Sequence, residues 1–510
     1  MSTWGDGYVD DSSYIHGFYR ELTPNLLALL ALTKGQRSPD PNARLTYCEL
    51  GSGLGLSPNL LAAANPQVTF YGNDFNPSHI LESRALANES GSDNVHFFEQ
   101  SFEEFIDEPS LPPTFDFITL HGIYSWISPE NRAHIVEFVK RKLAPGGLLY
   151  ISYNALPAWS AQMPLQRLLI DHAATQSGPM VGRVQSAVEF AEKLKQADAA
   201  YFRHTPHAAQ RLTSMPQKPR SYVAHEYFNQ HWTPFYHADV VKELAGAKVS
   251  YLGSAALLEN NDAMFLPPEV IEVLKEIKDS TLRETVRDYS AYPMFRRDVF
   301  VRGPSPIARA AVQTQWLNRP FAVVSPRSDI PMRVEGIPRD VRLRAEVYGP
   351  ILDELARVPS TVRQLLTHPT IRNFGAARVI QALETLTGMG HVQPCLDPAD
   401  LAARTERTNA FNRAVFERAC VSGEIQFVAS PVTGGGVPMA QISMLILLGL
   451  QKQPSQMPKF VNEALQAQGL RMRKDGKPLE TEDESLAEIQ VHANEIESKF
   501  APVWRQLKII

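Results

Sequence analysis

The stretch Glu49-Leu50-Gly51-Ser52-Gly53-Leu54-Gly55 decides the expected fold. It ends an apolar run at residues 45–50 and leads into a helical stretch at residues 57–64, where Pro58 suits the first helical turn. A buried strand, a glycine-rich turn and a helix in this order form the opening unit of a parallel α/β sheet. The glycines let the backbone approach a ligand closely, because a side chain there would collide with it. The stretch therefore predicts a ligand-binding turn at the carboxyl end of the first strand.

Apolar runs and helical stretches alternate from residue 45 to residue 153, as expected for strand-helix units. Asn76-Pro77 and Ser128-Pro129 each provide an N-cap followed by proline, a signal that starts a helix. We expect an α/β fold with a Rossmann-like sheet of seven strands. The predicted strands are residues 45–50, 68–73, 95–98, 115–120 and 148–153, with two further candidates at 248–252 and 298–301.

Composition limits the class of protein. A chain of 510 residues exceeds what one hydrophobic core usually organises, and 44% hydrophobic with 21% charged residues is typical of folded globular proteins. The net charge of -5 argues against a nucleic-acid partner. Three separated cysteines match no metal-ligand spacing and no disulfide framework, so we expect no metal and a reducing compartment. The acidic N-terminus and the short apolar stretches predict a cytoplasmic protein with no membrane partner.

The spacing of the glycines discriminates between two kinds of cofactor. A dinucleotide fingerprint reads G-x-G-x-x-G and presents a helix N-terminus to a pyrophosphate. Here the spacing is G-x-G-x-G, and Glu49 precedes Gly51 by two positions, which suits a cofactor with no phosphate and a cationic end. We infer S-adenosylmethionine, with contacts from Glu49, Gly51, Ser52 and Gly53; a simple tight turn is the alternative. Asp74 ends the second strand, where it can accept hydrogen bonds from both ribose hydroxyls or cap the next helix.

The end of the third strand supplies candidates for adenine recognition. Gln100 or the backbone of Ser101 could bind the edge of the ring, and Phe102 could stack on its face. Core packing of Phe102 is the alternative. We expect these residues to lie beside Asp74, because consecutive parallel strands end at the same edge of the sheet.

The stretch Leu120-His121-Gly122-Ile123-Tyr124-Ser125-Trp126 follows the fourth strand and should face the transferring methyl group. Methyl transfer from a sulfonium is an in-line displacement that depends mainly on alignment. Tyr124 and Trp126 are candidate catalytic residues that could steer a cationic centre by cation–π attraction, with simple packing as the alternative. His121 is a candidate for orienting the nucleophile, taking its proton or contacting the cofactor; a structural histidine is the alternative.

We expect four parts along the chain. Tyr8, Tyr14 and Tyr19 could form a lid over the cofactor, and a long helical stretch after residue 154 is available for substrate contacts or for those of a homodimer. Prolines cluster after Gly303, which indicates a domain boundary there. Helical runs at 360–367 and 376–388 resemble a winged helix. The charged run 471–485 is expected to be a solvated loop. The parts are the S-adenosylmethionine-binding core with its N-terminal lid (1–154), a helical insertion or regulatory region completing the sheet (155–303), a middle domain of possible winged-helix type (304–400) and a mainly α C-terminal domain (401–510).

Four stretches carry a resemblance to a known family: ELGSGLG (49–55), LHGIYSWI (120–127), HEYFNQHWTPFY (225–236) and ASPVTGGG (429–436). The chain resembles class I S-adenosylmethionine-dependent methyltransferases, specifically the bacterial proteins that add a methyltransferase regulatory domain and include the rickettsial-type protein-lysine methyltransferases. The resemblance implies cofactor contacts at Gly51, Gly53 and Asp74 and substrate contacts near Tyr124 and Trp126. It also implies a protein acceptor, such as an outer-membrane protein precursor. Gln100 departs from the usual acidic residue, which puts adenine recognition in doubt.

Three functions remain open at this point. A protein-lysine methyltransferase must remove a proton from the lysine ammonium before attack, and a desolvating aromatic pocket would favour that loss. A methyltransferase for a small molecule or glycan is the first alternative, although the large C-terminal portion favours a macromolecular acceptor. A non-catalytic cofactor-binding or DNA-binding regulator is the second alternative, but acidic residues offset the arginines of the predicted winged helix, so no strong basic stripe forms.

Overall fold

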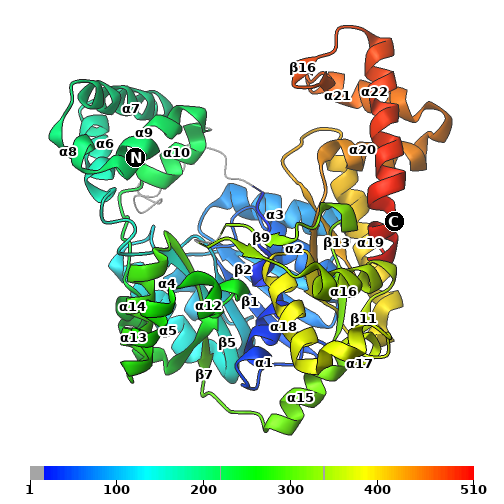
Figure 1. Ribbon diagram of the computed structural model, residues 1–510. Coiled ribbons are helices and arrows are strands. Elements are labelled where there is room, and N and C mark those ends of the chain that lie inside the picture. Colours follow the sequence, from blue (N-terminus) through cyan, green and yellow to red (C-terminus); the bar gives the residue numbers. More distant parts are fainter. Residues whose placement is uncertain (1–15, 219, 337–338) are drawn as a thin grey trace.

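The computed structural model describes residues 16–218, 220–336 and 339–510. A seven-stranded sheet lies at its centre, with the strand order β3-β2-β1-β4-β5-β7-β6 (Figure 1). Strands β1 to β5 are parallel, and β7 runs antiparallel to both β5 and β6. The expected α/β fold is therefore confirmed. The strands are β1 (Leu45–Leu50), β2 (Val68–Asp74), β3 (Val95–Glu99), β4 (Phe115–Leu120), β5 (Leu143–Asn154), β6 (Val249–Ser254) and β7 (Phe295–Arg302).

Strand β5 is longer than the sequence predicted. The strand was expected to begin at residue 148, after Pro145-Gly146-Gly147, but Leu143 already pairs with Phe115, and the register shifts before Phe117. Gly146 has a φ of 82°, and a Cβ on Gly147 would lie 2.9 Å from the carbonyl oxygens of Ala144 and Asp116. The glycines therefore form an irregularity within the strand rather than its beginning.

Side chains alternate between the two faces of the sheet and divide its core into two clusters. On β1, Tyr47 belongs to one cluster, whereas Cys48 and Leu50 belong to the other. The first cluster is covered by α1 (Pro24–Thr33) and α2 (Leu56–Ala64), and the second by α4 (Phe102–Ile106), α5 (Pro129–Lys142) and α11 (His237–Leu244). Helix α3 (Pro77–Glu89) begins after Asn76, whose side chain accepts a hydrogen bond from Ser78 N, as expected for this N-cap.

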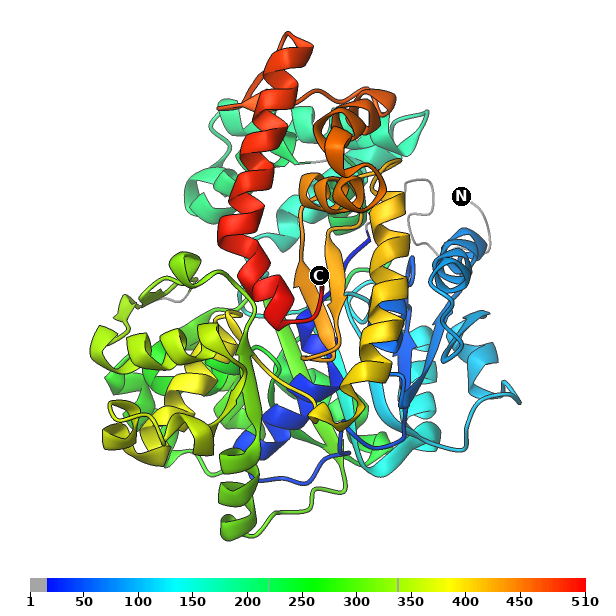
Figure 2. The same ribbon diagram turned by 90° about the vertical axis from the view of Figure 1, so that its right-hand side faces the viewer.

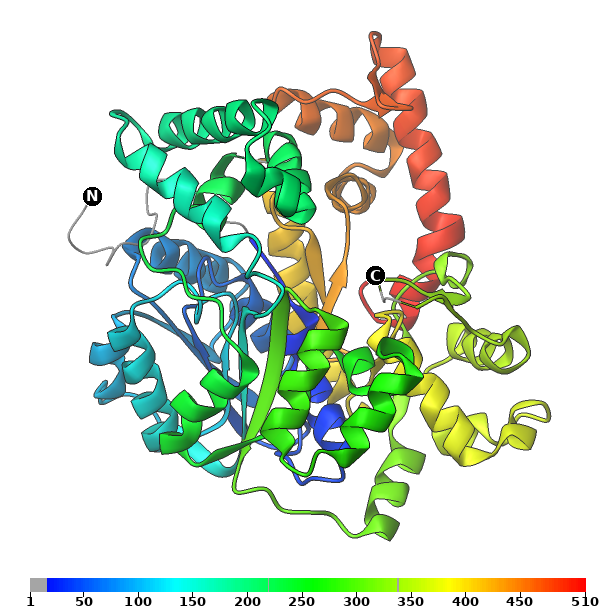
Figure 3. The ribbon, with the colours of Figure 1, turned by 60° about the vertical axis from the view of Figure 1, so that its left-hand side comes forward.

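A helical insertion follows β5 at the carboxyl edge of the sheet. It packs around its own hydrophobic cluster, which includes Trp159, Leu169 and Leu212, and projects away from the sheet (Figure 3). The chain then returns to the sheet through α11, β6 and β7, with three more helices between these two strands. The helices of this region are α6 (Met163–Ala174), α7 (Met180–Gln196), α8 (Ala200–His204), α9 (Pro206–Ser214), α10 (Arg220–Tyr227), α12 (Asp262–Phe265), α13 (Pro268–Glu276) and α14 (Ser280–Ala291).

The next part of the chain, after α15 (Arg309–Asn318), contains a small sheet of order β11-β8-β12. The winged-helix type of this part stays a prediction. The predicted helix at 360–367 is shorter than expected, because Thr361 caps Gln364 N and leaves Ser360 and Thr361 extended. The elements are β8 (Pro320–Val323), β9 (Arg333–Val334), β10 (Val341–Arg342), α16 (Ala345–Arg357), β11 (Ser360–Thr361), α17 (Val362–Leu365), α18 (Gly375–Gly388) and β12 (Val392–Pro394).

The last part is mainly helical and contains a hairpin that lies between α19 and the final helices (Figure 2). The charged run 471–485 is not the loop that was expected: it forms the hairpin β15–β16, and Thr481 caps α22, which starts at Glu482. The elements are α19 (Leu401–Arg418), β13 (Phe427–Ser430), β14 (Gly435–Pro438), α20 (Gln441–Lys452), α21 (Met457–Ala467), β15 (Arg473–Lys474), β16 (Lys477–Pro478), α22 (Glu482–Glu495) and α23 (Ala501–Gln506).

The β13–β14 hairpin packs directly on the amino-terminal part of the core. Asn65, at the end of α2, donates a hydrogen bond to Gly434 O at 2.8 Å, and Asn25 of α1 donates to Thr433 O at 3.4 Å. A Cβ on Gly436 would lie 2.6 Å from the ring of Phe18. Glycine is therefore needed where the hairpin meets the core, and the sheet region is completed by residues from the far end of the chain.

Candidate active site

The glycine-rich turn between β1 and α2 has a backbone that only glycine adopts easily. Gly51, Gly53 and Gly55 have φ values of 68°, 54° and 70°. Space is restricted as well, since a Cβ on Gly51 would lie 2.6 Å from Ile123 Cδ1 in the loop after β4. The turn is thus held close to the end of β4, and any side chain at Gly51 would displace that loop.

Asp74, at the end of β2, holds the glycine turn in place. Its Oδ2 accepts a hydrogen bond from Gly53 N at 3.0 Å, and its Oδ1 accepts from Asn76 N at 2.9 Å and lies 3.2 Å from His79 Nδ1. An ionised carboxylate has about four acceptor positions, so these three contacts leave room for roughly one more donor. The buried carboxylate and the side-chain-free turn are therefore adjacent, as the sequence interpretation requires.

Glu49 lies at the end of β1 with a carboxyl group that lacks a complementary donor. It is buried, and among the described residues no group hydrogen-bonds its Oε2. Burial raises the pKa of Glu49 to about 8. An unsatisfied buried carboxyl is costly unless a ligand supplies the donor. An ammonium group, such as that on the methionine part of S-adenosylmethionine, would fit this position.

The end of β3 lies beside Asp74, because Gln100 N donates to Asp74 O at 3.2 Å. The side chain of Gln100 donates to Glu108 at 2.7 Å, while its buried Oε1 has no partner among the described residues. Ser101 is used differently, since its hydroxyl caps α4 through Glu104 N. Phe102 is half-buried and packs against the core, which was the alternative interpretation of this residue.

His121, after β4, is enclosed by aromatic rings. Its Nδ1 lies 2.8 Å from the Tyr150 hydroxyl, and the ring of Tyr19 stacks on it with 3.6 Å between ring centres. Burial, with a smaller contribution from the nearby Arg297, lowers the pKa of His121 to about 3. The imidazole is therefore neutral at physiological pH. Of the three tyrosines expected to form a lid, Tyr19 is at this position, whereas Tyr8 and Tyr14 lie outside the described residues.

Tyr124 occupies a packed position. The side chain is fully buried, its hydroxyl donates to Glu243 at 2.5 Å, and the guanidinium of Arg132 lies 5.1 Å from the centre of the neighbouring Phe235 ring. These contacts agree with the packing alternative and leave no face of the Tyr124 ring open to a ligand. Within the aromatic stretch after β4, Tyr124 is therefore packed in the core, whereas His121 lies among the rings of Tyr19 and Tyr150.

Trp126 lies where the β4 loop meets the helical insertion. Its half-buried ring is 6.5 Å from that of Trp232, and Thr233 N donates to Ser125 O at 2.8 Å. The aromatic stretch 225–236 therefore contacts the loop that follows β4, although the two are about one hundred residues apart in sequence.

Sequence reasoning missed the groups that surround His121 from β5 and β7. Tyr150 belongs to an apolar strand and gave no separate signal. Arg297 pairs with Glu21 at 2.9 Å and with Glu259 at 3.4 Å. The charges of Arg296-Arg297-Asp298 at the start of the strand predicted at 298–301 were a usable signal, because buried charges are usually paired.

The sheet order with its reversed β7, the glycine turn and the adjacent Asp74 together define a class I methyltransferase architecture. The methyltransferase-domain family matches residues 48–149, and the predicted methyltransferase regulatory domain matches residues 219–302, the region that supplies β6 and β7. The chain belongs to the S-adenosylmethionine-dependent methyltransferases that carry this regulatory domain.

Relatives extend the likeness over the whole chain. An uncharacterised protein of Synechocystis sp. is 40% identical over 99% of this chain and 100% of its own length. An uncharacterised protein of Rickettsia prowazekii is 25% identical over 56% of this chain and 51% of its own. The structure of PKMT2 from Rickettsia typhi in complex with AdoHcy aligns with a TM-score of 0.68 and 18% identity, over 94% of this chain and 97% of that one. This last likeness shows that the fold is shared.

Two kinds of feature are absent from the described part of the chain. Within it, no helix has the length and apolar character needed to cross a bilayer. No group of three or more histidine, cysteine, aspartate or glutamate residues in the same part is arranged to hold a metal ion.

Proposed function

We propose that this methyltransferase modifies lysine side chains of a protein substrate. The observation that carries the proposal is the extent of the likeness to PKMT2 from Rickettsia typhi: it covers 94% of this chain, including most of residues 304–510. The sequence itself resembles the rickettsial-type protein-lysine methyltransferases. A small acceptor needs no such additional docking surface. The hairpin 429–436 supports the same view, because it joins the C-terminal part to α1 and α2 of the cofactor-binding core.

We further propose the roles of individual residues in holding the cofactor. Gly51 and Gly53 would allow close backbone approach, Asp74 would accept a ribose hydroxyl, and Glu49 would pair with the ammonium group. The free Oε1 of Gln100 would accept a hydrogen bond from the adenine amino group. S-adenosylmethionine supplies an electrophilic methyl group on a sulfonium.

His121 is too weak a base to take the proton of a lysine ammonium. Its pKa of about 3 lies far below the value of about 10.4 for lysine, so the transfer would be strongly uphill. We therefore assign His121 and the stacked Tyr19 a positioning role at the end of β4. Loss of the proton would come from desolvation of the lysine among aromatic rings, because burial favours the neutral amine. Trp126 is a candidate for one of these rings.

Radiolabelled S-adenosylmethionine and fractionated bacterial extract test the proposal. An unfolded outer-membrane protein fragment should be included as a candidate acceptor. Label should appear in protein bands and be recovered as methylated lysine after acid hydrolysis, and Asp74→Ala should abolish it. Label confined to small molecules or glycans would instead support the alternative acceptor class. A homodimer stays a prediction, and light scattering of the full chain tests it.

A further inference from the structure

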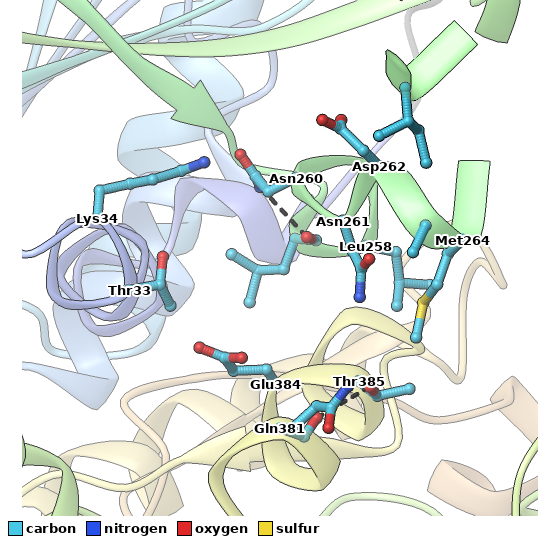
Figure 4. A pocket seen from close by; sticks show the side chains of 13 residues that line it. Thr33, Lys34, Leu258, Asn260, Asn261, Asp262, Met264, Gln381, Glu384 and Thr385 are labelled. Atoms are coloured by element: carbon cyan, nitrogen blue, oxygen red, sulfur yellow. Dashed lines mark hydrogen bonds between the residues drawn. The ribbon is translucent and has the colours of Figure 1, made fainter. Parts of the chain in front are cut away.

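A pocket lies on the β6 side of the sheet, at the same carboxyl edge as the glycine turn. It has a volume of about 450 Å³ and lies between the end of α1, the segment 257–264 after β6, and α18 (Figure 4). Strand β6 is at the edge of the sheet, and the glycine turn follows β1, with three strands between them. The pocket therefore lies between the region matched by the regulatory domain and α18, and its lining includes neither the glycine turn nor Asp74.

Two glycines allow the walls of this pocket to approach one another. A Cβ on Gly253, in β6, would lie 2.8 Å from Lys34 Cε and 2.6 Å from Asn260 Oδ1. A Cβ on Gly388, at the end of α18, would lie 2.6 Å from Leu258 Cγ. The aliphatic part of Lys34 thus passes over the backbone of β6, and α18 rests against the segment after β6. These contacts fix the positions of the three walls.

Lys34 and Glu384 bring opposite charges to the pocket from α1 and α18 (Figure 4). Among the described residues, neither side chain has a hydrogen bond or an ion pair. Asp262 is different, because it is paired with Arg283 at 2.6 Å and with Arg287 at 2.8 Å. Lys34 is exposed to solvent, whereas Glu384 is half-buried, and its burial raises the pKa of Glu384 although the nearby Lys34 opposes that shift. A ligand with complementary charges would pair with both side chains.

The rest of the lining limits the kind of ligand. Asn261 and Gln381 add amide groups that can donate and accept hydrogen bonds, and Met264, Leu258 and Ile271 add an apolar surface. We propose that this pocket binds a small zwitterion of the amino-acid class, with its carboxylate on Lys34, its ammonium on Glu384 and its side chain against the apolar wall. A cavity of this size is ordinary for a small-molecule site.

Calorimetric titration of the full chain with each of the common L-amino acids tests the proposal. At least one should bind, and Lys34→Gln and Glu384→Gln should each weaken that binding roughly tenfold or more, because each leaves one ligand charge unpaired. Lys459→Gln, on the exposed face of α21, is the matched control and should bind as the wild type does. Unchanged S-adenosylhomocysteine affinity in all three variants would show that they are folded.

A second measurement does not depend on the charge variants. Methionine methyl groups labelled with ¹³C should include one resonance, assigned by Met264→Leu, that shifts when the amino acid is added. No binding of any amino acid at millimolar concentration would overturn the proposal. Equal binding by the glutamine variants, or binding of inorganic phosphate in place of every amino acid, would also overturn it.

Discussion

Replacement of Asp74 by asparagine is the most informative change in the cofactor site, because it alters no more than one atom and a charge. Both carboxylate oxygens accept from backbone amides: Oδ2 from Gly53 N at 3.0 Å and Oδ1 from Asn76 N at 2.9 Å. Asparagine has only one carbonyl oxygen, so its NH₂ group must face one of these N–H donors. At least one hydrogen bond to a charged acceptor is lost in either orientation of the amide.

The loss can be given a magnitude. A hydrogen bond to a charged group contributes about 1.5–3 kcal/mol. If the glycine turn must be held by Asp74 for the cofactor to bind, Kd for S-adenosylhomocysteine should rise about 10- to 150-fold in Asp74→Asn. Asp74→Ala should lose at least as much, because it removes both acceptors and the ribose contact.

Isothermal titration with S-adenosylhomocysteine measures this effect, and thermal unfolding shows whether the variants remain folded. Asp93→Asn is the matched control, because Asp93 is exposed and pairs with Arg407 at 2.9 Å, outside the site. It should leave the affinity unchanged. An affinity of Asp74→Asn within about twofold of wild type would refute the assignment, since twofold is less than the weakest such bond predicts.

The remaining predictions concern protonation and packing. Because the pKa of Glu49 in the folded protein is raised to about 8, the unfolded chain loses this proton first, and the stability of the fold decreases as pH rises from about 4.5 to 8. Glu49→Gln should therefore resist urea better than wild type above about pH 8, with an advantage that shrinks toward about pH 5. A difference that does not change with pH would contradict this. His121 should show no histidine titration by NMR between about pH 5 and 9, because its pKa is about 3; an inflection there would show that it is less enclosed. Gly436→Ala should cost about 1–3 kcal/mol in denaturant unfolding through its clash with Phe18. The matched Gly182→Ala, in a helix with open space around it, should instead stabilise by roughly 0.5–1 kcal/mol, and equal effects of the two would argue against the close contact.

Local patterns in the sequence were sufficient to predict most of the sheet. Strands β1 and β4 have the predicted bounds, and Asn76 and Ser128 start helices as expected, because burial, capping and proline placement act within a few residues. The start of β5 was wrong because only the pairing of Leu143 with Phe115 in the neighbouring strand shows that the Pro-Gly-Gly segment lies within the strand.

Only part of the candidate site could be predicted from the sequence, because some of its contacts join residues that are far apart in the chain. The positions of Glu49 and Asp74 follow from parallel strands that end at one edge, so their proximity to the glycine turn was foreseeable. The environment of Tyr124 was not, because it depends on Glu243 in a helix after the long insertion. Likewise, no local pattern in the sequence indicates that Tyr150 and Tyr19 enclose His121.

The contact between the β13–β14 hairpin and α2 has a consequence for synthesis of the protein. Asn65 emerges from the ribosome long before Gly434, its hydrogen-bond partner. The apolar surface around Phe18 that the hairpin covers therefore stays exposed while most of the polypeptide is translated. Completion of the amino-terminal fold is thus a late event in synthesis, and a gene shortened at its 3′ end before the hairpin should yield an aggregation-prone product rather than a smaller working enzyme.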